Sequence, residues 1–136
     1  TIMAKSMHCV NALGVCQFPT IFNAKPAYER FLNAVTGWNL TVHDYLDVGE
    51  RIAAIRQAFN VREGFRPADF RLPDRAIGKP PQERGPLEGV TIAVDSQVKQ
   101  YFRLMDWDVH TGKPSKDRLL VLGLEDVARD LYPVNR

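Results

Sequence analysis

The sequence predicts an all-α fold: an irregular multihelical domain over residues 1–136, with a long Pro/Gly-rich loop at about residues 65–91. Apolar residues recur at helical spacing through most of the chain, and GVTIAV (89–94) is the one stretch that resembles a strand of useful length. A chain of 136 residues is the size of one domain and can bury a core without disulfides or metals.

A first helix is expected at residues 25–36, in the segment KPAYERFLNAVT. Pro26 lies near its N-terminus, where a proline is tolerated because its missing N–H would have no helical partner. Gly37 follows as a typical C-terminal stop. The predicted apolar face consists of Ala27, Phe31, Leu32 and Val35.

The clearest helical segment is residues 41–62. Thr41 and Asp44 have the spacing of a capping box, and Gly64 follows the segment as a C-terminal stop. Gly49 costs roughly 1 kcal/mol against alanine inside a helix, so it indicates close packing against another helix. The predicted apolar stripe consists of Val42, Tyr45, Leu46, Ile52, Ile55, Ala58 and Phe59.

Residues 65–91 contain five prolines and three glycines, which prevent long regular structure. A loop of this length is unusual in a compact domain, so we expect it to be functional, to wrap over another surface, or to be partly mobile.

Three helices are expected after the loop. Asp95 is the predicted N-cap of a helix that runs to Met105. Its predicted buried face consists of Val98, Tyr101, Phe102 and Met105. Ser115 begins a short helix that ends at Gly123. LEDVARDLY begins another, with acidic residues in the first turn, where the helix dipole favours them.

Composition excludes several classes of function. Charged residues make up 25% of the chain, the net charge is +2, and basic residues alternate with acids, so a nucleic-acid partner is not expected. No apolar run approaches the ~20 residues that span a bilayer, and no secretory signal pattern is present. We therefore expect a cytoplasmic protein with reduced thiols and no membrane partner.

The residues alone leave the role of the two cysteines open. A cysteine between Val15 and Gln17 is most often a small core residue, and Cys9 has the same interpretation. A weaker alternative is an independent metal site of His8, Cys9 and Cys16, although the cysteine spacing fits no common zinc motif. Common nucleotide-binding and hydrolase motifs are absent, and acids such as Glu50 have the pattern of a helix surface.

Four segments in order resemble the tungsten-containing aldehyde:ferredoxin oxidoreductase family. NALGVC (11–16) is similar to the family's Asp-x-x-Gly-Leu-Cys element, and RQAFNVREGF (56–65) to its Arg-x-Phe-Asn-x-Arg-Glu-Gly run. ADFRLPDR (68–75) is similar to a segment ending in Leu-Pro-x-Arg. YFRLMDWDVHTGKPSKDRLLVLGL (101–124) is similar to the family's Tyr-Tyr, Gly-Trp-Asp, Gly-x-Pro-Thr and Leu-Gly-Leu ending.

The resemblance implies a tungsten (or molybdenum) bis-pterin and a [4Fe-4S] cluster in the full-length protein. Three cluster cysteines of the family lie in a middle domain, and Cys16 matches the fourth. Asn11 and Val15 are then expected beside a pterin, and Gly14 would let the backbone approach a bulky cofactor. A [4Fe-4S] cluster usually takes four thiolates, so a lone cysteine serves as a ligand only when others come from elsewhere.

Two departures from the family element affect the pterin contact. Asn11 replaces the aspartate, which keeps hydrogen-bonding capacity but loses a carboxylate acceptor, and Val15 replaces leucine. These changes suggest a divergent branch of the family.

The leading hypothesis is the C-terminal domain of an oxidoreductase that oxidises aldehydes to carboxylic acids and passes electrons to ferredoxin. Its partners would be the missing N-terminal and middle domains, and the fragment alone should be inactive and hold no cofactor. The alternative is a non-catalytic helical interaction or cover module in which Cys16 is a core residue. On the first hypothesis, residues 11–16 should be exposed and flexible in this chain, because the surfaces that they face are absent.

Overall fold

The computed structural model describes residues 1–18 and 27–133 and confirms the all-α prediction. GVTIAV forms no strand, and extended pairing in the described residues is limited to two isolated bridges, Gln82 with Glu88 and Trp107 with Pro114. Within the same ranges, no helix is long and apolar enough to cross a membrane.

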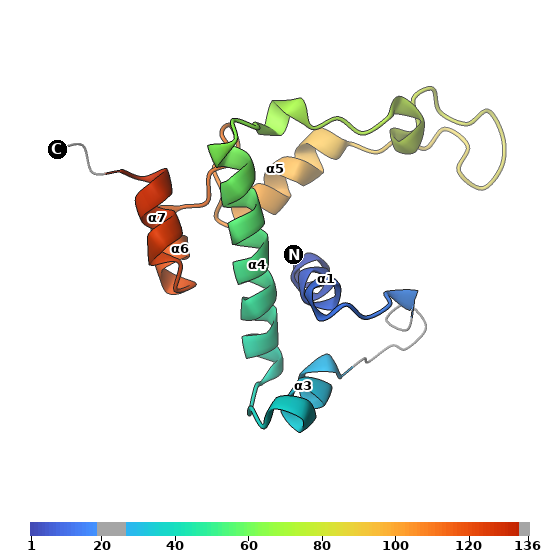
Figure 1. Ribbon diagram of the computed structural model, residues 1–136. Helices are drawn as coiled ribbons and strands as arrows, with labels where there is room; N and C mark the ends of the chain where they lie inside the picture. Colours follow the sequence, from blue (N-terminus) through green and yellow to red (C-terminus); the bar gives the residue numbers. More distant parts are fainter. Residues whose placement is uncertain (19–26, 134–136) are drawn as a thin grey trace.

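The longest helix, α4 (Val42–Arg62), is the central element of the fold (Figure 1). Helix α1 (Ile2–Leu13) packs along one side of it, and α6 (Lys116–Val121) and α7 (Glu125–Leu131) lie on the other side. Helix α3 (Tyr28–Thr36) lies near its N-terminal end. The sequence analysis named no separate helix for residues 2–13, so α1 is an element that it missed.

The start of α4 confirms the predicted capping box. The backbone N–H of Asp44 donates to the Thr41 hydroxyl at 3.2 Å, and the backbone N–H of Thr41 donates to the Asp44 carboxylate at 2.7 Å. Two otherwise unpartnered donors of the first turn are thereby satisfied. The predicted bounds of this helix agree with the structure.

The predicted apolar stripe of α4 is only partly buried. Tyr45 and Ala58 are buried, but Val42, Ile55 and Phe59 are 53%, 43% and 52% exposed. Most of the buried residues of α4 are small, namely Gly49, Ala53, Ala54 and Ala58. Small residues allow neighbouring helices to approach closely. Periodicity finds large apolar side chains, and here several of them lie outside the core of this chain.

Two hydrophobic clusters form the core. The first joins α4 to α6 and α7 and consists of Ala54, Ala58, Leu119, Leu122, Leu124, Ala128 and Leu131. The second lies at the end of α5 (Val94–Leu104) and contains Ala53, Met105 and Trp107. Rings of Tyr101 and Phe102 meet Trp107 edge-on, with centroids 5.6 and 5.4 Å away, an arrangement that aromatic pairs favour.

The remaining helix predictions need three corrections. On the predicted face of α5, Met105 is buried, but Val98 is 37% exposed. The predicted face of α3 is wrong at Phe31 and Val35, which are 69% and 87% exposed, and Pro26 lies outside the described residues. Asp95 is not the N-cap of α5 but lies in its first turn, after Ala93. Ser115 caps α6 as predicted, and its hydroxyl accepts from the backbone N–H of Arg118 at 3.1 Å.

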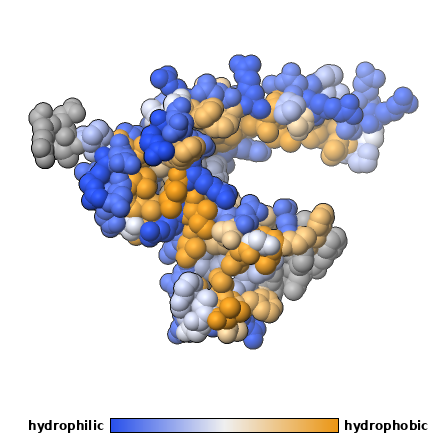
Figure 2. Space-filling model, in the orientation of Figure 1, coloured by the Kyte–Doolittle hydropathy of each residue, from blue (hydrophilic) through white to orange (hydrophobic). Residues whose placement is uncertain are grey.

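Residues 65–93 form an arm that extends away from the helices (Figure 1). It contains two short 3₁₀ helices, η1 (Pro67–Asp69) and η2 (Asp74–Ile77), and none of its residues is fully buried. Figure 2 shows apolar atoms along one long edge of the arm and hydrophilic atoms along the other. Its exposed large apolar side chains are Phe65, Phe70, Leu72, Leu87, Val90 and Ile92.

Candidate functional site: the turn after α1

The candidate site begins where α1 ends. Gly14 adopts a left-handed conformation (φ 67°, ψ 20°), and its N–H donates to the Asn11 carbonyl oxygen at 3.3 Å. A side chain at residue 14 would be strained by this backbone, and nothing lies within 4 Å of where its Cβ would be. The glycine thus turns the chain sharply out of α1 and leaves open space beside the backbone.

All four residues assigned to the site from the sequence lie together on this turn and are exposed. Asn11 is in the last turn of α1, Gly14 is its C-cap, and Val15 and Cys16 follow directly. Cys16 carries a free thiol. The predicted exposure of residues 11–16 is confirmed, and Cys16 is not a residue of this chain's own core.

The other cysteine has a structural role in the contact between α1 and α4. Cys9 is 3% exposed, and its thiol donates to the Tyr45 carbonyl oxygen at 3.1 Å. Burial raises the pKa of Cys9, so this thiol stays protonated and unreactive near neutral pH. Cys9 is therefore a core residue, as its pattern indicated.

Helix α1 approaches α4 unusually closely at Gly49, as predicted for a glycine inside the longer helix. A Cβ at residue 49 would collide with the Lys5 carbonyl oxygen and would lie 3.0 Å from Cys9 Sγ. The Tyr45 hydroxyl donates to the Ser6 carbonyl oxygen at 3.4 Å, in the same contact. Burial is the largest cause that raises the pKa of Tyr45 to about 12, so its hydroxyl remains a donor.

A metal site built from His8, Cys9 and Cys16 is not supported. Across residues 1–18 and 27–133, no group of three or more His, Cys, Asp or Glu side chains is placed to hold a metal ion. His8 Nδ1 instead lies 3.1 Å from Arg56 Nη1. Burial and the Arg56 charge lower the pKa of His8, which favours the neutral ring as the acceptor of this hydrogen bond.

His8 and Arg56 also line a groove that the sequence analysis missed. The groove has a volume of about 700 Å³ and lies between α4, α5 and the start of the arm, with Phe70, Tyr101 and Trp107 among its apolar walls. Its lining residues come from segments far apart in the sequence, so no local pattern marks them.

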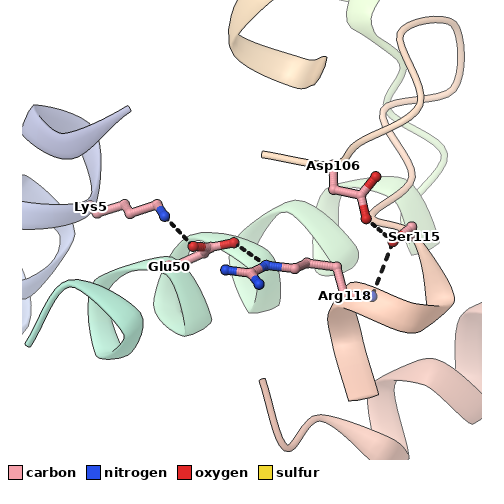
Figure 3. A network of polar contacts seen from close by, with 5 residues as sticks. All are labelled: Lys5, Glu50, Asp106, Ser115 and Arg118. Atoms are coloured by element: carbon pink, nitrogen blue, oxygen red, sulfur yellow. Dashed lines mark hydrogen bonds and ion pairs between the residues drawn. The ribbon is translucent and has the colours of Figure 1, made fainter. Parts of the chain in front are cut away.

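The structure overturns the surface interpretation of Glu50. This carboxylate is 2% exposed and is paired with Lys5 of α1 and Arg118 of α6 (Figure 3). Burial alone would raise its pKa, but hydrogen bonds and charge from Arg118 and Lys5 outweigh burial and hold the pKa of Glu50 below its usual value. Its partners lie 45 and 68 residues away, beyond the reach of a local pattern.

A family model and individual relatives both relate this chain to aldehyde ferredoxin oxidoreductases. A family model described as aldehyde ferredoxin oxidoreductase, domains 2 and 3, matches residues 1–124. The chain is similar to tungsten-containing aldehyde ferredoxin oxidoreductases of Pyrococcus furiosus, Pyrococcus abyssi and Thermococcus kodakarensis, at 36%, 33% and 32% identity over 118 residues. Each match covers 86% of this chain and 19% of the relative, so the chain spans about a fifth of the length of these curated relatives. With the family model matching most of its length, this chain belongs to the aldehyde ferredoxin oxidoreductase family.

Proposed function

We propose that this chain is the C-terminal domain of a tungsten (or molybdenum) bis-pterin oxidoreductase that oxidises aldehydes to carboxylic acids. Electrons would leave through a [4Fe-4S] cluster to ferredoxin, and Cys16 would be one cluster ligand. The observation that carries the proposal is an exposed, free thiol directly after a sharp glycine turn, in a chain of this family. The relatives are named tungsten-containing aldehyde ferredoxin oxidoreductases, and these names support the proposed metal, substrate class and electron acceptor.

The donor set of this chain fits a shared site. The sequence has two cysteines, and the structure buries Cys9 in the α1–α4 contact. Of the two cysteines, Cys16 alone is exposed and could contribute a thiolate to a cluster. A [4Fe-4S] cluster usually takes four thiolates, so the other three would have to come from another segment. The 136-residue chain by itself would therefore hold no cluster and would be inactive.

When bound, the pterin-held metal would supply the two-electron oxidation, and the cluster would supply one-electron transfer. The residues of this chain would bind and orient. Cys16 would contribute a thiolate, and the exposed side-chain amide of Asn11 could donate to or accept from a pterin ring. The open space beside Gly14 would admit a bulky group, and Val15, which is 43% exposed, would add an apolar contact that excludes water.

The proposed partners within the full-length protein are its N-terminal and middle domains. An arm without buried residues and with one apolar edge is the kind of surface that another domain covers. Val42, Ile55 and Phe59 of α4 are exposed large apolar residues of the same kind. We expect residues 65–93 to resist proteolysis in the full-length protein and to be cleaved readily in the isolated chain.

The ligand assignment is tested by replacing each cysteine in the full-length protein. Cys16→Ser should lose iron and acid-labile sulfide. Cys9→Ser is the matched control: it also removes one thiol, but its hydroxyl can still donate to the Tyr45 carbonyl, so the cluster content should not change. Equal iron and sulfide contents in the Cys16→Ser and wild-type proteins would refute the proposal.

The alternative of a non-catalytic interaction or cover module draws its support from the same arm. It predicts that Cys16→Ser leaves iron content and aldehyde oxidation unchanged, while shortening the arm weakens association with a partner. The cysteine variants therefore separate the two functions in one measurement.

A further inference from the structure

A single buried carboxylate connects the helix that carries the candidate site to the C-terminal helices. One oxygen of Glu50 accepts from Arg118 Nε, and the other is paired with Lys5 Nζ (Figure 3). The chain of contacts continues from the backbone N–H of Arg118 to the Ser115 hydroxyl, which donates to the Asp106 carboxylate. The network thus joins α1, α4, α6 and the turn after α5.

Such a charge is costly to bury, and apolar residues of the same size would often serve stability equally well. The best-attested use of a buried ionic group is to fix one register between helices. At the point where α1 and α4 approach most closely, the facing residues Gly49 and Cys9 are small, and the larger Tyr45 makes hydrogen bonds beside them. Small residues allow two helices to approach closely but do little to prevent one helix from shifting along the other. A carboxylate between two cations, by contrast, pairs with both in only one relative position of the helices.

The position of Cys16 depends on the position of α1. This helix is continuous from Ile2 to Leu13, and Cys16 follows its terminal turn. A helix rises 1.5 Å per residue, so even a shift by one residue moves its end by about 1.5 Å. Metal ligands must be held to within about 0.5 Å, so the register of α1 decides whether Cys16 is in place.

We propose that Glu50 is a positioning residue for the cofactor-binding turn: by pairing with Lys5 and Arg118, it fixes the register of α1 and so the place of Cys16. This inference rests on the proposed function, in which Cys16 is a cluster ligand. Glu50 itself would not touch the cluster or the substrate. Its effect would be exerted through Lys5 and the α1 helix.

The test compares two variants of the full-length protein that break the same pair from opposite sides. Glu50→Gln keeps the shape of the side chain and removes its charge; Lys5→Met keeps the aliphatic stem and removes the ammonium. Both should make the apparent affinity for iron fall about 10- to 100-fold in competition with a chelator, as loss of supporting interactions around a metal site typically does. Both should also change the electron paramagnetic resonance spectrum of the reduced cluster.

Leu131→Ala separates positioning from a loss of stability. Leu131 is buried in the cluster between α4, α6 and α7, so this variant lowers the melting temperature without removing any contact of α1. It should retain iron and the wild-type spectrum. If Glu50→Gln retains iron as well as Leu131→Ala does, the positioning role is refuted. Should Glu50→Gln fail to fold, Lys5→Met decides the question, because Lys5 is partly exposed and its loss is better tolerated.

Failure of this inference is distinguishable from failure of the proposed function. If Cys16→Ser keeps its iron, the proposed function fails and the positioning role fails with it. If Cys16→Ser loses its iron but both network variants keep theirs with unchanged spectra, only the role of Glu50 is refuted.

Discussion

The two sides of α4 are built differently. Toward α6 and α7 it presents Ala54 and Ala58 to a cluster of leucines, among them the fully buried Leu119. Toward α1 it presents Gly49 and the charged Glu50, which also pairs with Arg118 of α6, and the contact with α1 includes a thiol hydrogen bond and an ion pair. Burial of apolar surface stabilises the fold but does not depend on direction. Close backbone approach and paired charges favour one position of a helix relative to its neighbour. The first side is therefore suited to stability and the second to placing α1.

The largest loss of stability is expected on the apolar side. Leu119→Ala removes a side chain that is 0% exposed and leaves a cavity between α4, α6 and α7. The free energy of unfolding should fall by about 2–5 kcal/mol, as measured by denaturant titration. If the proposed cluster is present, the iron content of the full-length variant should equal that of the wild type at temperatures where the variant remains folded. Loss of iron from folded protein would contradict the division between the two sides.

A smaller loss of stability with a larger effect on the site is expected at Gly49. Gly49→Ala would place a methyl group against the Lys5 carbonyl, so α1 must move away from α4. Overpacking of this kind costs about 1–3 kcal/mol. Unlike Leu119→Ala, this variant should lose iron while folded. A Gly64→Ala variant is the control: it places the same methyl group in open space, so any strain comes from the backbone alone.

The ion pair on the α1 side should make stability depend on pH. Partners hold the pKa of Glu50 below its ordinary value of 4.5, so its contribution is complete above that pH and is lost as the pH falls through the lower folded-state pKa. Near neutral pH, Glu50→Gln should cost toward the lower end of about 1–3 kcal/mol, because Lys5 and Arg118 are partly exposed. Melting curves of the two proteins should converge in acid; a constant difference would show that the charge of Glu50 is not the cause.

The smallest effect is expected at the far end of the network. Ser115→Ala removes the N-cap of α6 and the contact with Asp106, which should cost about 1 kcal/mol. Ser115→Thr keeps the hydroxyl and should recover most of the loss in thermal unfolding. Because Ser115 supports Arg118 and does not touch α1, the iron content should not change.

Local signals in the sequence predicted much of the fold. The Thr41–Asp44 capping box and the Ser115 cap depend on residues three apart, so their pattern and their geometry coincide. Gly49 was also informative, because a glycine inside a long helix has few purposes other than close approach. The cluster of Asn11, Gly14, Val15 and Cys16 on one turn follows from their adjacency in the chain.

Long-range pairing was not predictable from the sequence. Glu50 has the pattern of a surface residue because two of its neighbours in the chain are polar or small. Its two cationic partners, Lys5 and Arg118, lie far from it in the sequence, on opposite sides. Large apolar residues such as Ile55 and Phe59 were assigned to the core because periodicity does not reveal which face a neighbour covers. The chain spans about a fifth of the length of its curated relatives, and the proposed function assigns these exposed residues to contacts with other domains.

The contrast between the two thiols gives the chain a selective chemical handle. Cys16 is exposed, whereas Cys9 is buried and its thiol donates a hydrogen bond to the Tyr45 carbonyl oxygen. Burial also raises the pKa of the Cys9 thiol. A maleimide reagent should therefore label the folded chain at one position, directly after α1, without any engineered cysteine. On the proposed function, a fluorophore or spin label attached there would report docking of the other proposed domains onto that turn.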